Sequence, residues 1–151
     1  FLQFPGLLIW CAFIGWACFL HSGGETTLVS SITGSMVLGA VMAWIFSLIF
    51  VSGVLPFPQA VSGALLVTVI APIIILASSM KLFSVVPASF YGFATTFAYL
   101  AQTPGTFTMD AMTAFALENA VIIVPISLLI GSFVGWLQTV GVGQLIANKE
   151  A

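Results

Sequence analysis

The sequence predicts an all-α protein, a polytopic transmembrane helical bundle that forms one domain over residues 1–151. Of the 151 residues, 61% are hydrophobic and 4% are charged, whereas an ordinary soluble domain has about 25% charged residues. Apolar runs of about 16 to 25 residues recur between polar or Gly/Pro breaks, and this is the length at which a helix crosses a bilayer. No segment alternates with period two, so a transmembrane β-barrel is excluded.

The first two predicted helices cover residues 5–20 and 27–51. A small side chain stands at every fourth position of the second helix. These residues are Ser31, Ser35, Gly39, Ala43 and Ser47. Because lipid supplies no hydrophobic force between helices, small faces are where membrane helices approach each other closely. We therefore expect the second helix to pack inside the bundle.

The third and fourth predicted helices cover residues 60–79 and 87–102, and a turn with Pro56 and Pro58 precedes them. Pro72 lies inside the third helix, where a proline removes one backbone hydrogen bond and predicts a kink. Such a kink either serves packing or opens a path for a solute.

The fifth predicted helix covers residues 111–138 and has its own small-residue face. That face consists of Ser127, Gly131 and Gly135. Glu118 and Asn119 lie within its apolar run, and an ionisable group at membrane depth is a functional candidate. The alternative is that the helix begins near Asn119 and that residues 111–117 form an amphipathic stretch at the interface.

Residues 6–24 and 87–105 share one pattern. Each has an aromatic residue, a second aromatic six positions later followed by alanine, and a small polar exit that ends in glycine. The pairs are Trp10 with Tyr91, Trp16 with Phe97, Ala17 with Ala98, His21 with Gln102, Ser22 with Thr103 and Gly24 with Gly105. We interpret this as a structural duplication, with halves of about residues 1–55 and 56–151.

The basic residues predict the orientation of the helices. If all five helices cross the membrane, Lys81 and Lys149 fall on one side, and the positive-inside rule makes that side, with the C-terminus, cytoplasmic. The first helix and its copy, the fourth, then run in opposite directions, as in an inverted repeat with three helices per half. Because the third helix precedes the fourth, we expect a matching helix before the first. The predicted architecture is therefore a 3+3 inverted repeat whose first helix is missing from this chain.

Three strings resemble a known family. They are WCAFIGWACFLHSGG at 10–24, VVPASFYGFATTFA at 85–98 and PISLLIGSFVGWL at 125–137. In this order they are similar to the YcdZ-like bacterial inner-membrane proteins, a domain-of-unknown-function family of small polytopic proteins. The link between the second and third strings is longer here. The resemblance implies a multi-pass protein of the bacterial inner membrane and implies no substrate.

The residue inventory argues against metal, cofactor and enzyme chemistry. One histidine, two cysteines and four scattered acids do not form a zinc or iron ligand set. Cys11 and Cys18 are about 10 Å apart by helical rise, beyond the reach of a disulfide. The sequence has no nucleophile with a base, no phosphate loop and no basic patch. We expect no enzymatic activity and no nucleic-acid partner.

The remaining candidates are polar and paired aromatic side chains that could line a pore or a substrate path. They are Trp10, Trp16, Tyr91, Phe97, His21, Gln102, Glu118 and Asn119. The paired aromatics form either a shared constriction or ordinary core and belt positions. His21 is either a gate or a hydrogen-bonding residue at the interface.

These observations favour a channel or facilitator-type transporter for a small uncharged or weakly polar solute. An ion pump needs several buried carboxylates, and the four acids of this chain are scattered. The alternative is a non-transporting accessory subunit that packs in a larger membrane complex. The expected partners are the lipid bilayer, further copies of the chain or a larger complex, and a small solute.

Overall fold

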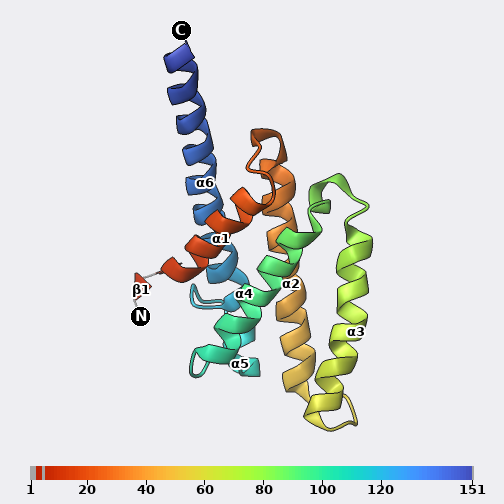
Figure 1. The fold of residues 1–151 in the computed structure, drawn as a ribbon. Helices are drawn as coiled ribbons and strands as arrows, with labels where there is room; N and C mark the ends of the chain where they lie inside the picture. The colour runs from red at the N-terminus through yellow and green to blue at the C-terminus, as the bar shows by residue number, and fades with distance from the viewer. Residues whose placement is uncertain (1–2, 5, 151) are drawn as a thin grey trace.

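The computed structural model describes residues 3–4 and 6–150, and within them the fold is all-α apart from one short strand pair (Figure 1). The helices are α1 (Ile9–His21), α2 (Val29–Ser52), α3 (Gln59–Ala77), α4 (Val86–Gln102), α5 (Met109–Thr113) and α6 (Ala120–Glu150). Two 3-10 turns, η1 (Thr26–Leu28) and η2 (Lys81–Phe83), precede α2 and α4, and β1 (Gln3–Phe4) pairs antiparallel with β2 (Leu7–Leu8).

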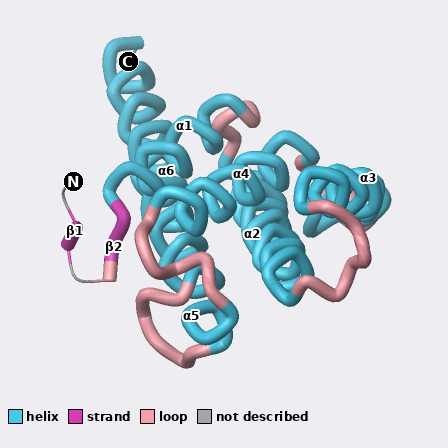
Figure 2. The backbone as a smooth tube through the Cα atoms, turned by 90° about the horizontal axis from the view of Figure 1, so that it is seen from below, coloured by secondary structure: helices cyan, strands magenta, loops and turns pink. Residues whose placement is uncertain are grey.

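Two helix pairs form the centre of the molecule. Helix α1 packs on α6, and α4 packs on α2, with smaller contacts between the pairs. Helix α3 lies at the edge against α2 (Figures 1 and 2). It buries only four side chains, which are Ser62, Leu66, Ile70 and Ile74.

Three helices have the length and composition to cross a bilayer. They lie in Thr26–Ser52, Gln59–Ala77 and Ala120–Ile146. Helices α1 and α4 have 13 and 17 residues, which at 1.5 Å per residue makes them only about 20 and 25 Å long. Of the five predicted spans, these three therefore meet the length requirement. Helix α1 is a shorter apolar helix, and α4, which packs on α2, is also shorter than the three spans.

The start of the first predicted helix was wrong. Helix α1 begins at Ile9, because the residues before it form the β1–β2 turn instead. Gly6 has a φ of 79°, a value that glycine adopts at no steric cost. Pro5, the expected first residue, lies outside the described residues.

The fifth predicted helix, residues 111–138, was also wrong at both ends. Its first part is the separate helix α5, and the long helix α6 begins only at Ala120. The alternative start near Asn119 is therefore confirmed. At its other end α6 continues to Glu150 through Gly141 and Gly143, because a glycine inside a helix costs only about 1 kcal/mol and does not end it.

The chain direction alternates as the five-helix prediction required. Figure 1 shows the segment after α1, the segment after α3 and the end of α6 at one end of the molecule, whereas the α2–α3 turn and α5 lie at the other. Lys81 and Lys149 belong to the first of these two ends.

Buried side chains form two apolar clusters. The larger lies among α1, α2, α4 and α6 and contains Phe19, Met36 and Leu128, each fully buried. The smaller lies between α2 and α3 and joins Phe46 to Ile70 and Ile74.

Candidate functional site

Two glycines allow α2 and α4 to cross in backbone contact. A Cβ built on Gly39 would overlap the carbonyl oxygen of Ser89, and one built on Gly92 would overlap that of Met36. Only glycine fits at either position without moving the opposing backbone. Membrane helices use such residues to approach closely.

Helices α1 and α6 cross through a second pair of glycines. A Cβ on Gly15 would overlap the carbonyl oxygen of Leu128, and one on Gly131 would overlap that of Ala12. Each crossing therefore consists of a glycine on either helix that meets a backbone carbonyl three residues before the opposing glycine.

At each crossing a serine hydroxyl accepts a hydrogen bond from the backbone at the start of the shorter helix. The N–H of Leu8, the N-cap residue of α1, donates to Ser127 Oγ at 2.9 Å, and the N–H of Val85, the N-cap residue of α4, donates to Ser35 Oγ at 3.2 Å. The first backbone donors of a helix have no partner within it. The two serines supply that partner from a neighbouring helix.

The other small residues predicted for packing also lie at these contacts. Ser31 Oγ donates to the carbonyl of Lys81 at 2.9 Å, and Ala43 is fully buried on α2. A Cβ on Gly135 would approach the Phe19 and Trp16 rings of α1.

Five phenylalanines form a continuous cluster beside the α2–α4 crossing. Phe46 meets Phe93 and Phe97 edge to face at centroid distances of 5.9 and 5.4 Å, and it stacks on Phe50 at 5.8 Å. Phe107, on the loop after α4, meets Phe50 at 6.0 Å and Phe97 at 6.1 Å. Such spacings are favourable for aromatic pairs.

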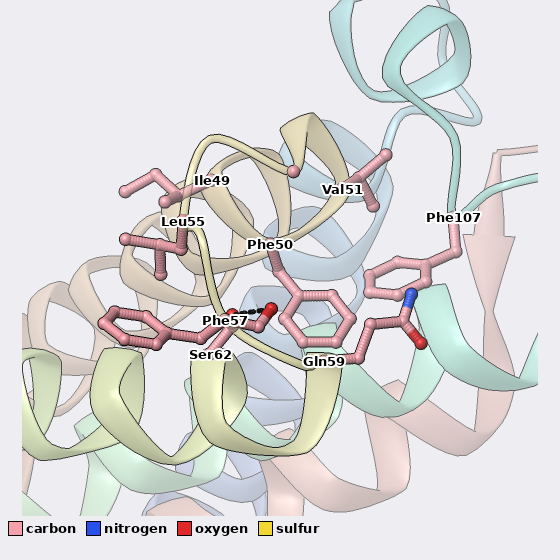
Figure 3. Close-up of a pocket in the computed structure, with 9 residues that line it drawn as sticks. Ile49, Phe50, Val51, Leu55, Phe57, Gln59, Ser62 and Phe107 are labelled. Carbon is pink, nitrogen blue, oxygen red and sulfur yellow. Dashed lines mark hydrogen bonds between the residues drawn. The ribbon is translucent and has the colours of Figure 1, made fainter.

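A cavity of about 290 Å³ adjoins this cluster at the α2–α3 turn (Figure 3). Its walls include Phe50, Phe57 and Phe107. Its polar side chains are Gln59 and Ser62, and Ser62 Oγ already donates to the Phe57 carbonyl at 3.2 Å. The nine described residues that line the cavity include no charged one.

The predicted aromatic candidates have separate neighbours. Trp16 stacks on Phe13 and donates from Nε1 to Gln138 Oε1 at 2.7 Å. Tyr91 Oη lies 3.3 Å from His21 Nδ1. Phe97 belongs to the phenylalanine cluster, and Trp10 packs against the larger core cluster.

Asn119 is the N-cap residue of α6 and has every side-chain group engaged. Its Nδ2 donates to the carbonyls of Met112 and Ala114, both at 2.8 Å, and its Oδ1 accepts from the Val121 N–H at 3.1 Å. The Met112 carbonyl also accepts from Trp44 Nε1 at 3.0 Å. Asn119 therefore ties α5 to α6, and Trp44 ties α5 to α2.

Glu118 and Gln102 are both exposed. Gln102 is the last residue of α4, and Glu118 lies between α5 and α6. The backbone carbonyl of Glu118, and not its carboxylate, accepts from Tyr99 Oη at 2.8 Å. Glu118 and Asn119 border a second cavity of about 270 Å³.

Three residues that line the larger cavity were not predicted from the sequence: Phe50, Gln59 and Phe107. All three lie in or beside the Pro/Gly-rich breaks, which were interpreted only as turns. The available signal was an aromatic residue within each polar break, at Phe57 and Phe107. Within residues 3–4 and 6–150, no group of three His, Cys, Asp or Glu side chains could hold a metal ion.

Three apolar helices of spanning length, joined in one bundle, define a multi-pass membrane protein. The chain belongs to the family described as protein of unknown function (DUF1097), whose profile matches residues 1–143. No curated protein and no solved structure matches the chain.

Proposed function

We propose that the chain is a facilitator-type membrane transporter built as an inverted repeat, which carries a small uncharged or weakly polar solute. One observation carries the proposal, the equivalence of the two glycine crossings. A shift of 77 residues takes Gly15 to Gly92, Ala12 to Ser89 and Leu8 to Val85. A shift of 92 residues takes the matching positions of α2 to α6, including Gly39 to Gly131 and Ser35 to Ser127.

The sequences agree with these shifts. Residues 13–17 read FIGWA and residues 90–94 read FYGFA, while residues 35–44 read SMVLGAVMAW and residues 127–136 read SLLIGSFVGW. The register differs by four residues from the one that the aromatic spacing predicts, because Trp16 now matches Phe93 and not Phe97. Helix α1 of the first half thus packs on α6 of the second half, and α4 of the second half packs on α2 of the first.

Inverted halves favour transport over a purely structural role. Transporters commonly use two antiparallel halves that meet near the bilayer midplane, where rocking of one half against the other gives alternating access. The absence of charged residues from the lining of the larger cavity suits an uncharged solute. In this proposal the protein lies in the bacterial inner membrane with Lys81, Lys149 and the C-terminus in the cytoplasm.

Flux through reconstituted vesicles tests this function. Purified protein in liposomes is compared with empty liposomes by light-scattering swelling against a panel of small neutral and weakly acidic solutes. We expect faster swelling for at least one solute and a change in its rate on Phe97→Ala. Phe133→Ala, an exposed aromatic on α6, is the matched control. Equal rates with and without protein for every solute would rule out the facilitator.

The accessory-subunit alternative rests on a different observation. Helix α3 covers the α2–α4 crossing at Phe46, and the 92-residue shift takes Phe46 to Gln138. No described residue covers that second face as α3 covers the first, and the Trp16–Gln138 hydrogen bond lies exposed on it. A polar pair on a membrane helix is typical of a contact with another helix. Gentle detergent extraction followed by native mass spectrometry would test it. Further subunits lost on Gln138→Leu would favour this alternative.

A further inference from the structure

The two matched halves provide an internal control for the phenylalanine cluster. Residues that the helix crossings require recur in both halves, as do Trp44 and Trp136. The phenylalanines do not recur, because the same shifts take Phe93 to Trp16 and Phe50 to Val142. Two further members, Phe97 and Phe46, correspond to Leu20 and Gln138. Phe46, Phe50, Phe93 and Phe97 pack in the cluster that α2 shares with α3, so α3 accounts for their concentration in one half. Phe107, on the loop after α4, lies outside that cluster and extends the row of rings to the cavity.

The cluster ends at the larger cavity, where two of its rings form the wall. Phe50 and Phe107 are 6.0 Å apart with an interplanar angle of 30°. Phe57, another lining residue, is half exposed, and the exposed Gln59 contributes the amide of the lining (Figure 3). Aromatic faces, one amide and no charge suit a neutral molecule with an aromatic ring.

We propose that this cavity binds a small neutral aromatic molecule with one hydrogen-bonding group, which stacks against Phe50 and Phe107 and pairs with the Gln59 amide. A volume of about 290 Å³ exceeds the roughly 150 Å³ of an apolar cavity that holds benzene, so one substituted or fused ring fits. A lipid acyl chain would occupy the apolar wall but would form no hydrogen bond with the exposed Gln59 amide. The inference rests on the proposed function, since it names the class of solute that the facilitator carries.

Binding of 5-fluoroindole to the purified protein in detergent, followed by fluorine NMR, tests the assignment. Protein-free micelles give the partition baseline. We expect saturable binding above that baseline, weakened about tenfold by Phe107→Leu, since a stacked aromatic contact contributes at this level. Phe133→Leu, on the exposed face of α6, should leave the affinity unchanged. Gln59→Leu should weaken 5-fluoroindole but not fluoronaphthalene, which has no hydrogen-bonding group.

Melting curves show that each variant is folded, and Phe57→Leu replaces Phe107→Leu if the latter unfolds. No saturable binding, or equal loss with Phe107→Leu and Phe133→Leu, would overturn the site. Displacement of the probe by decane and indole alike would assign the cavity to acyl chains instead. Binding without vesicle flux would contradict only the facilitator, whereas flux without binding here would contradict only this site.

Discussion

One hydrogen bond at the start of each short helix, from Leu8 to Ser127 and from Val85 to Ser35, provides a matched pair of mutations. Ser35→Ala and Ser127→Ala each leave one backbone N–H at a helix start without its partner in an apolar setting. An unsatisfied buried donor costs about 1 to 3 kcal/mol. We therefore expect both variants to melt earlier in detergent and by similar amounts. Ser52→Ala, exposed at the end of α2, is the control and should melt like the wild type. A loss for only one of the two would show that the two bonds are not equivalent.

Asn119 is expected to act in stability and not in solute passage. Asn119→Ala removes an N-cap and two donors to the carbonyls of α5. Loss of the cap alone costs about 0.5 to 2 kcal/mol. The melting temperature of this variant should be clearly lower than that of the wild type. Glu118→Gln, at an exposed residue, should leave the melting temperature unchanged. Equal melting of both variants would contradict the structural role of Asn119.

Periodic small residues are a clearer sequence signal for helix contacts than single polar or aromatic residues are. Periodic small side chains at Ser35, Gly39 and Gly131 indicate a contact face, because only close backbone approach explains them. Asn119 could not be assigned from sequence. Its partners, the carbonyls of Met112 and Ala114, become available only because α5 ends at Thr113.

The helix crossings depend on glycine, and another glycine provides a control at which alanine should stabilise the protein instead of destabilising it. Gly39→Ala and Gly131→Ala place a Cβ into an opposing backbone carbonyl, and overpacking costs about 1 to 3 kcal/mol or more. Nothing lies near the Cβ position of Gly141 on the same helix α6 as Gly131, so Gly141→Ala should stabilise by up to about 1 kcal/mol through helix propensity. Calorimetry, or a melting assay that does not rely on cysteine labelling, gives the change in stability for all three variants. Unchanged stability of the two crossing variants would refute the close contacts.

The bounds of α2, α3 and α4 were predicted well, and those of the first and fifth predicted helices poorly. Helices α2, α3 and α4 lie within two residues of the predicted bounds, since long apolar runs and Pro/Gly breaks mark them. The beginning of α1 was missed, and the division of residues 109–120 was predicted only as the alternative helix start near Asn119. Both depend on tertiary partners, namely the Ser127 hydroxyl for α1 and the Asn119 contacts for α5 and α6.

The proposed duplication rests on the two glycine crossings, and the aromatic pattern of the sequence predicts it in a register displaced by one helical turn. Aromatic residues such as Trp16 and Phe97 sit on partly exposed faces, where position is weakly constrained. The glycines meet an opposing backbone, so their spacing cannot drift without separating the helices. A search for repeats in membrane chains should therefore weigh small residues above aromatic ones.

The proposed inverted repeat requires that the two halves of the chain cross the membrane in opposite directions. The most direct measurement is two-sided labelling of single cysteines at Thr27 and Thr108, the segments that follow α1 and α4, in a protein with Cys11 and Cys18 replaced by alanine. Both threonines are exposed. A membrane-impermeant maleimide applied to intact cells should label Thr108→Cys at once and Thr27→Cys only after permeabilisation, with Lys81→Cys behaving as Thr27→Cys does. Labelling of Thr27→Cys and Thr108→Cys from the same side would contradict antiparallel halves.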